Sequence, residues 1–400
     1  MSKAEYTSMN KFRQSWRWYG PDDLVSLSDA KQAGATEIVT ALHHMPTGEI
    51  WTIDEIEKRK AEVEHAGLIW DVVESVPIHE DIKTRTKNYQ RYIDAYKASI
   101  QNLGKAGVRI LTYNFMPVVD WTRTDLNYQL ADGSKALRFD ATAMIAFDVY
   151  ILERTGAADD YTIQQLKDAE KYLAELSNDQ KETLIWNITA GLPGSMAAKT
   201  NSLKSFKALV KSYQGISSST LREHLLLFLD EVIPVAEESG IRMAIHPDDP
   251  PFKLFGLPRV VSNQEDVRAI FKRADSVTNG LCFCTGSFGV NADNDLVSML
   301  RDFGPRIHFI HLRATKREDD GSFYEAQHLT GDVDMYAVVK ELVNIQQSRK
   351  ESLPMRPDHG HVILSDLDKK TNPGYSGIGR LKGLAELRGL ELGIINSMQQ

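Results

Sequence analysis

The chain of 400 residues contains only two cysteines, Cys282 and Cys284. A single residue separates them, and two cysteines so close cannot form an unstrained disulfide. Proteins without disulfides are typical of reducing compartments, so we expect a cytoplasmic protein. In that setting, a thiol beside a turn is a metal ligand, a nucleophile or a core residue.

Long apolar runs and an excess of basic residues are also missing. No stretch approaches the roughly 18 apolar residues that would span a bilayer, and the first residues have no apolar segment typical of a secretion signal. The formal net charge is -8, whereas nucleic-acid binding depends on clustered Lys and Arg. We therefore expect a small-molecule partner, with neither nucleic acid nor membrane as a partner.

Short runs rich in β-branched residues alternate with amphipathic stretches, a pattern typical of parallel β-α units. Eight such runs predict a (β/α)8 TIM barrel. They lie at residues 17–19, 37–42, 68–73, 108–113, 241–245, 280–284, 306–310 and 352–356. The last is the weakest, because a proline does not fit inside a central strand.

The segment from about 117 to 200 breaks this alternation and is too long for a β-α loop. We interpret it as a helical or irregular insertion after the fourth strand, so that residues 1–400 form one barrel domain with this addition. Elsewhere, capping boxes predict helix starts at Thr52, Thr220 and Ser262. An apolar stripe predicts a helix over 220–238.

Four consecutive predicted strands end in a residue that can bind metal, namely His246, Cys284, His311 and Asp358. Functional residues of a TIM barrel lie at the carboxyl ends of its strands. Imidazole, thiolate and carboxylate are common ligands of divalent first-row metals, so one ion could bind all four. A single histidine at a strand end is more often structural, and it is the repetition that favours metal. We expect Cys282 to be a core residue and His308 to be structural.

Nine sequence blocks resemble those of the D-mannonate dehydratase family. They are WRWYGP at 16–21, TALHHMPTGE at 40–49, VVESVPIHEDIK at 72–83, YNFMPVVDWTRTDL at 113–126, HPDDPP at 246–251, CTGS at 284–287, HLR at 311–313, GDVDMY at 331–336 and RPDHGH at 356–361. The resemblance implies a xylose-isomerase-like TIM barrel that uses Mn2+ or Fe2+. It also implies a hydro-lyase that converts D-mannonate to 2-keto-3-deoxy-D-gluconate in hexuronate breakdown.

Matching the family's motifs to this sequence implies the same four metal ligands, His246, Cys284, His311 and Asp358. It also implies that His359 and Tyr375 are catalytic. One of them would remove the C2 proton and the other would protonate the leaving C3 hydroxyl, and the sequence leaves these two roles open. We expect Gly360 to let the backbone turn sharply after the strand.

Other polar residues near the strand ends are candidates for binding the substrate's hydroxyls and carboxylate. They are His44, Glu74, Asn114 and Arg313, with His43 as a weaker candidate and His361 as a substrate contact, a support for a neighbouring site residue, or a structural residue. Each could instead be a salt-bridged residue at the rim. Trp121 and Arg123 in the insertion could close over the site as a lid. We also expect a homo-oligomer.

Two other functions are compatible with the pattern. A metal-dependent sugar isomerase could use the same barrel, although such sites usually hold two ions with several carboxylates and a lysine. A noncatalytic sugar-acid sensor would not need a base and an acid beside the ion.

Overall fold

The computed structural model describes residues 11–190 and 202–398, and its centre is a closed barrel of parallel strands. The order around the barrel is β1-β12-β9-β8-β7-β4-β3-β2, so the first and last strands of the barrel pair with each other. The barrel strands are β1 (Arg13–Arg17), β2 (Glu37–Thr40), β3 (Ile69–Glu74), β4 (Ile110–Tyr113), β7 (Arg242–Ile245), β8 (Asn279–Cys284), β9 (Ile307–Leu312) and β12 (Pro354–Pro357). The predicted TIM barrel is confirmed.

Seven predicted strands match the observed bounds to within two residues, but the predicted bounds of the first strand, 17–19, were wrong. β1 is Arg13–Arg17, and the aromatic residues Trp18 and Tyr19 follow its end. Its backbone pairs with β12 on one side and β2 on the other, which fixes its position along the barrel. β12 begins at Pro354, a strand end where the missing N–H of proline is tolerated.

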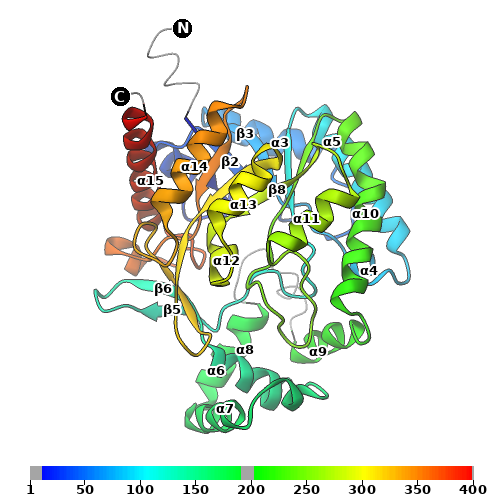
Figure 1. Ribbon diagram of the computed structural model, residues 1–400, viewed down its shortest axis with the longest axis vertical. Coiled ribbons are helices and arrows are strands. Elements are labelled where there is room, and N and C mark those ends of the chain that lie inside the picture. The colour runs from blue at the N-terminus through cyan, green and yellow to red at the C-terminus, as the bar shows by residue number, and fades with distance from the viewer. Residues whose placement is uncertain (1–10, 191–201, 399–400) are drawn as a thin grey trace.

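Helices surround the barrel on its outside (Figure 1). They are α2 (Leu27–Gln32), α3 (Ile53–His65), α4 (Glu80–Thr84), α5 (Tyr89–Lys105), α10 (Ser218–Glu238), α11 (Gln264–Arg273), α12 (Thr285–Val290), α13 (Leu296–Phe303), α14 (Met335–Gln347) and α15 (Gly377–Ser397), with the short turns η4 (Gly304–Arg306) and η5 (Leu364–Asp368). No helix within residues 11–190 or 202–398 is long and apolar enough to cross a membrane.

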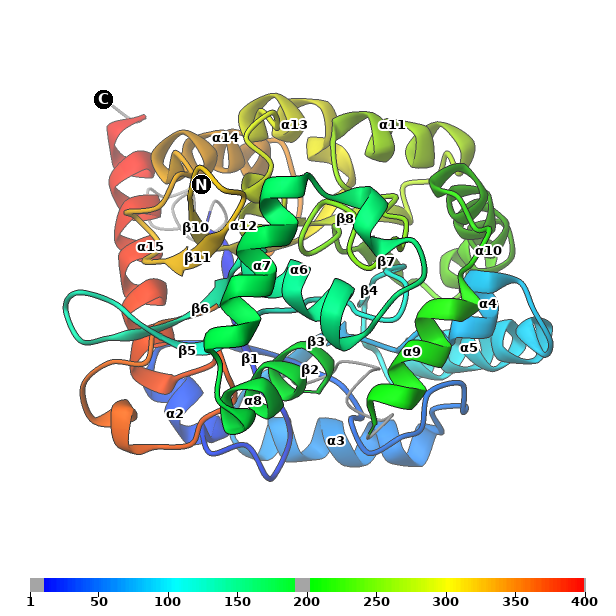
Figure 2. The same cartoon turned by 90° about the horizontal axis from the view of Figure 1, so that it is seen from below.

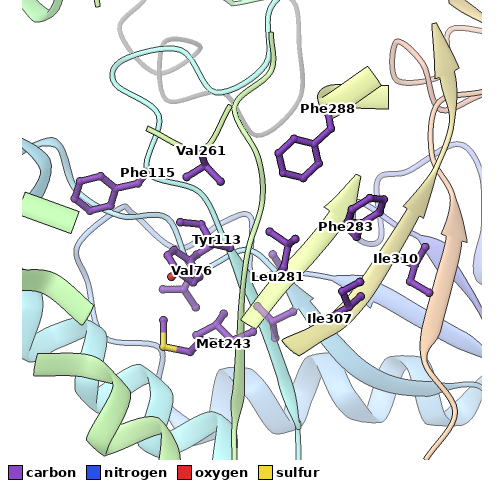
Figure 3. Packing of buried hydrophobic residues seen from close by; sticks show 14 of the residues in the cluster. Val76, Tyr113, Phe115, Met243, Val261, Leu281, Phe283, Phe288, Ile307 and Ile310 are labelled. Atoms are coloured by element: carbon purple, nitrogen blue, oxygen red, sulfur yellow. The ribbon is translucent and has the colours of Figure 1, made fainter. Parts of the chain in front are cut away.

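Apolar side chains fill both sides of the barrel wall. Leu281, Phe283, Ile307 and Ile310 of β8 and β9 belong to the large core between strands and helices (Figure 3). Inside the barrel, a smaller cluster contains Val39, Val72, Ile110, Ala244, Cys282 and Phe309. The expectation that Cys282 is a core residue is therefore confirmed.

The predicted helix starts are correct in one case of three. Thr52 is the N-cap of α3, and its hydroxyl accepts a hydrogen bond from the Glu55 N–H. The N-cap of α10 is Ser217 rather than Thr220, and that of α11 is Asn263 rather than Ser262. In both cases a second residue with a good capping side chain lies within three positions, so spacing alone could not choose between them.

Between β4 and β7 the chain leaves the barrel and covers one of its ends (Figure 2). The segment contains β5 (Asp125–Gln129), β6 (Lys135–Phe139), α6 (Ala141–Ala146), the π-helical turn η1 (Phe147–Ile151), η2 (Ala157–Asp160), α7 (Ile163–Glu175), α8 (Asn178–Thr189) and α9 (Leu203–Ser212). Helices α6 to α9 lie over the strand ends in Figure 2 and below the barrel in Figure 1.

A second, four-stranded sheet was not predicted. The hairpin β10 (Ala314–Arg317) and β11 (Phe323–Ala326) follows the seventh barrel strand, and β11 pairs antiparallel with β6 to give the order β10-β11-β6-β5. Arg138 of β6 also forms an ion pair with Glu318 of the β10–β11 hairpin, with Nη2 and Oε2 2.6 Å apart. The segment after β4 and the segment after β9 are thereby joined into one structure beside the barrel mouth.

Candidate active site

The carboxyl ends of the barrel strands surround a cavity of about 230 Å³. Its lining includes side chains from opposite ends of the chain, such as Arg17 at the end of the first strand and Tyr375 before the last helix. Trp121, from the segment after β4, also lines it. The cavity is therefore built by the barrel and covered in part by the added segment.

His246, which lines the cavity, lies close to Cys284 and His311. His246 directly follows β7, Cys284 is the last residue of β8, and His311 lies near the end of β9. One donor atom from each of the three lies within 4.8 Å of the others. The structure thus brings together three of the four predicted ligands in a compact group.

Asp358, the fourth predicted ligand, lies beside this group. Its Oδ2 is 3.8 Å from the Cys284 Sγ. Burial alone would raise the pKa of Asp358, but Arg356 and Arg313 hold the pKa well below its usual value. The Arg356 Nη1 and Asp358 Oδ1 are 2.5 Å apart, and the Arg313 Nε and Asp358 Oδ2 are 3.0 Å apart. The carboxylate is therefore charged, as a metal ligand must be.

The Cys284 thiol lies in an environment that favours the thiolate. Burial raises its pKa, but Arg313 and hydrogen bonds from His246 and His311 bring the pKa well below the usual value. Two imidazoles, a thiolate and a carboxylate, all close together and buried or nearly so, match the donors that transition metals prefer. The residues present fit a single divalent metal ion.

His359 and Tyr375, the predicted catalytic pair, lie side by side at the cavity. Their ring centroids are 5.3 Å apart, and the N–H of Gly360 donates to the carbonyl of Gly374 at 2.9 Å, which ties the two segments together. Burial raises the pKa of the Tyr375 phenol, so its hydroxyl stays protonated.

The expected role of Gly360 was wrong. Its φ is not in the left-handed region, so the backbone there does not require glycine for a turn. A side chain would instead collide with backbone atoms, because a Cβ at Gly360 would lie 2.6 Å from the Gly379 carbonyl carbon and the Arg380 nitrogen. Glycine is needed for the close approach of α15 to the segment that carries His359.

One wall of the cavity consists of two arginines held by Glu74. Arg356 binds Glu74 with its Nη2 2.9 Å from Oε1, and Arg17 lies 3.4 Å from the Glu74 Oε2. Arg356 Nε also donates to the His311 Nε2 at 3.1 Å. The positive charge of Arg356 and Arg17, together with His311, keeps the pKa of Glu74 well below its usual value, although burial alone would raise it.

The sequence did not single out these arginines, nor Tyr19 and Asp120, which also line the cavity. A signal existed for Arg356, because it lies two residues before Asp358 and so shares its strand face. For Asp120 no such signal exists, since it lies in an irregular segment. Burial raises the pKa of Asp120.

Of the predicted substrate-binding residues, Glu74 and Asn114 line the cavity, and so does the weaker candidate His43. His44, Arg313 and His361 do not. His44 is half exposed and its Nε2 lies 2.8 Å from the Glu55 Oε2. The His361 Nε2 donates a hydrogen bond to the backbone carbonyl oxygen of Glu325, 2.8 Å away. His43 and His44 are adjacent after the second strand, and only His43 reaches the cavity. The sequence analysis favoured His44 over His43, which was the wrong order.

Arg313 and Arg123 belong to a buried charge cluster instead of forming a substrate clamp and a lid, and Asp249 of this cluster lines the cavity. Both bind Asp249 and Glu325, and the side chains of all four are at most 2% exposed. Arg313 also contacts the Asp358 carboxylate and the His359 ring. Because its donors are directed to these protein groups, Arg313 contacts residues of the site rather than the cavity, and only Trp121 of the predicted lid reaches the cavity.

A closed barrel of eight parallel strands, with donor and acid–base side chains at the carboxyl ends, places the chain among the TIM-barrel enzymes. The family model described as D-mannonate dehydratase (UxuA) matches residues 12–400, and the chain belongs to that family.

Individual relatives agree with this assignment. The chain is 53% identical over 390 residues to a mannonate dehydratase from Marinomonas sp. (strain MWYL1), covering 96% of this chain and 99% of the relative. It is 50% identical over 385 residues to one from Saccharophagus degradans, covering 94% and 96%. The crystal structure of mannonate dehydratase from Streptococcus suis serotype 2 is 35% identical, with a TM-score of 0.77 and coverage of 97% and 95%.

Proposed function

We propose that this protein removes water from D-mannonate to give 2-keto-3-deoxy-D-gluconate, a step of hexuronate breakdown. The observation that carries the proposal is the placement of a metal-binding group and an acid–base pair around one cavity of about 230 Å³. Family membership supplies the substrate. A cytoplasmic location and a homo-oligomer stay predictions.

His359 removes the proton from C2 of the sugar acid, and Tyr375 protonates the hydroxyl that leaves C3. The C2–H and C3–O bonds break, a C2=C3 double bond forms, and water departs. The resulting enol takes up a proton at C3 and loses the one on its C2 hydroxyl, which gives the 2-keto acid. The protonated phenol of Tyr375 supports its role as the acid.

In this proposal, one Mn2+ or Fe2+ ion would be held by four ligands, His246, Cys284, His311 and Asp358. Such an ion supplies Lewis-acid stabilisation of the negative charge that develops when the C2 proton is removed. The thiolate ligand favours a transition metal over Mg2+, because soft donors bind Mg2+ poorly.

Arg17 is the proposed partner of the substrate carboxylate, because it lines the cavity and arginine is suited to binding carboxylates. Arg356 also lines the cavity, but it directs its donors to Glu74, His311 and Asp358. The Nε of Arg17 is buried and has no hydrogen-bond partner within the described residues, so it has a free donor. Glu74 and Asn114 are placed to bind hydroxyls, Glu74 as an acceptor and Asn114 as donor or acceptor.

The test is incubation of purified protein with D-mannonate and Mn2+, followed by detection of a 2-keto-3-deoxy acid. Protein treated with a chelator should be inactive and should recover with Mn2+ or Fe2+. A protein shown by elemental analysis to contain metal, but forming no 2-keto acid from D-mannonate, would contradict the proposal. So would full activity after all metal has been removed.

A further inference from the structure

Glu325 lies outside the barrel, on β11 of the second sheet, yet its side chain reaches behind the ring of His359. Its Oε1 is 3.1 Å from the His359 Nδ1. The same oxygen lies 2.5 Å from the Arg313 Nη1 and 2.7 Å from the Arg123 Nη2. The carboxylate is only 2% exposed, so no solvent competes for these contacts.

The two arginines keep this carboxylate charged in spite of its burial. Burial alone would raise the pKa of Glu325, but Arg313, His359 and Arg123 lower it to about 2. A buried carboxylate that remains ionised is a strong hydrogen-bond acceptor. Glu325 can therefore bind an N–H group of its neighbours but has no proton to donate.

The His359 Nδ1 has two neighbours that would place its proton differently. The Arg313 Nη1, a donor, is 3.0 Å away, and the Glu325 Oε1, an acceptor, is 3.1 Å away. Arg313 already directs a hydrogen of Nη1 to Glu325 at 2.5 Å. A charged carboxylate attracts the ring N–H more strongly than a neutral ring nitrogen attracts a guanidinium hydrogen, so the proton belongs on Nδ1.

We propose that Glu325 is a positioning residue, which accepts the His359 Nδ1–H and so leaves the Nε2 lone pair on the cavity side to take the substrate proton. The Nε2 is the ring nitrogen near the metal-binding group, 3.6 Å from the Asp358 Oδ1. Neutral imidazole carries one proton, so fixing it on Nδ1 decides which nitrogen acts as the base. This inference rests on the proposed function of His359.

The surroundings of Glu325 hold it in place from its backbone as well. His361, two residues after His359, forms a hydrogen bond with the Glu325 carbonyl oxygen at 2.8 Å. Phe323, on the same face of β11, packs under the guanidinium of Arg123 at 4.9 Å. The role of His361 that the sequence left open is thus an indirect one, since it anchors the backbone of Glu325 rather than the substrate.

The direct test is 15N NMR of the histidine rings in protein loaded with Zn2+, a diamagnetic ion. The signals of His359 are assigned by their loss in His359→Asn. In the unchanged protein we expect a protonated Nδ1 and an unprotonated Nε2. A proton on Nε2 instead would overturn the proposal, whatever any variant does.

Glu325→Gln tests the consequence for the reaction. It keeps the shape of the side chain but removes the charge, so the preference for Nδ1–H should weaken. We expect kcat to fall roughly a hundredfold or more while KM changes by less than about threefold. Exchange of the substrate C2 proton with D2O should slow by a similar factor.

Asp249→Asn is the matched control, because Asp249 binds the same two arginines but makes no hydrogen bond with the His359 ring. It should leave the His359 proton on Nδ1, whereas Glu325→Gln should not. An unchanged ring tautomer and a kcat within twofold of normal in Glu325→Gln would overturn the proposal. An unchanged protein that forms no product from D-mannonate contradicts the proposed function instead, and the NMR result for Glu325 stands independently.

Discussion

The indole of Trp121 is stacked on the imidazole of His359, with the ring centroids 4.6 Å apart and the ring planes at 29°. Trp121 also meets the edge of Tyr375, with centroids 6.1 Å apart. The segment after β4 therefore does more than cover the barrel mouth, because it contacts both members of the proposed acid–base pair.

Replacing Trp121 by Ala should lower kcat/KM by roughly tenfold, because aromatic stacking of this kind is worth about 0.5–1.5 kcal/mol and also excludes water. Steady-state kinetics with D-mannonate measures the effect. Trp186→Ala is the control, since Trp186 lies on α8 of the same segment and is 60% exposed. Equal losses in both variants would mean that the effect comes from the stability of the segment, not from the contact with His359.

Asp358 and His359 are neighbours with different proposed roles, so substituting each one should affect metal binding and kcat differently. Asp358→Asn replaces a charged ligand by a neutral one, so metal should bind more weakly and excess Mn2+ should partly restore activity. His359→Asn should bind metal normally and remain roughly a hundred- to ten-thousand-fold slower at any metal concentration. Metal titrations and kcat together decide between the roles.

The His359→Asn variant should also fail to exchange the C2 proton of D-mannonate in D2O. Rescue of His359→Asn by added Mn2+ would instead make His359 a metal ligand, and Tyr375 would become the leading candidate for the base.

Cys284→Ser should weaken metal binding by roughly tenfold or more, because a hydroxyl is a poorer ligand than a thiolate. Cys282→Ser is the matched control, since Cys282 is a fully buried neighbour two residues away in the apolar cluster inside the barrel. It should lower the thermal stability while the metal affinity stays the same. The ligand assignment is wrong if the two variants show the opposite order of metal affinities.

Glu391 on α15 should make the protein less stable as the pH rises. Burial raises its pKa from 4.5 to about 7, while the hydrogen bond from the Phe12 N–H lowers it only in part. Between pH 4.5 and 7 the folded state holds a proton that the unfolded state releases, so the free energy of unfolding falls across this range.

Glu391→Gln should remove this pH-dependent fall in the free energy of unfolding. The variant should be more stable than the unchanged protein at pH 8, by on the order of 1–3 kcal/mol, and the difference should vanish near pH 4.5. Thermal unfolding at a series of pH values measures it. Glu64→Gln, at a carboxyl that is 57% exposed, is the control for replacing a glutamate that is not buried. If the stability difference between Glu391→Gln and the unchanged protein were the same at all pH values, Glu391 would not be the source of the pH dependence.

The barrel and the metal-binding group were predictable because both depend on local patterns. Strand runs are read from hydrophobic periodicity, and parallel strands place their last residues at one edge, so His246, Cys284 and His311 follow from chain position alone. The second sheet was not predictable in this way. β6 and β11 pair across a sequence separation of more than 180 residues, and nothing local in either strand specifies the partner.

The errors among the polar residues have the same cause. Arg313 was expected to bind substrate, yet its buried partners Asp249 and Glu325 come from two other segments of the chain. His43 and His44 differ only in which way each points after the end of β2, and the phase of an irregular segment is not encoded in its spacing. The residues missed, Arg17 and Arg356, owe their positions to Glu74 on a third strand.

Arg17 and Asp358 lie at the ends of β1 and β12, the first and last strands of the barrel, which pair with each other. During synthesis, the ribosome must therefore make nearly the whole chain before these two walls of the cavity can meet. Partial chains that stop before β12 can form β-α units but not the site. Enzymatic activity should thus appear only after β1 has paired with β12 and closed the barrel. Activity is therefore a measure of the last stage of folding.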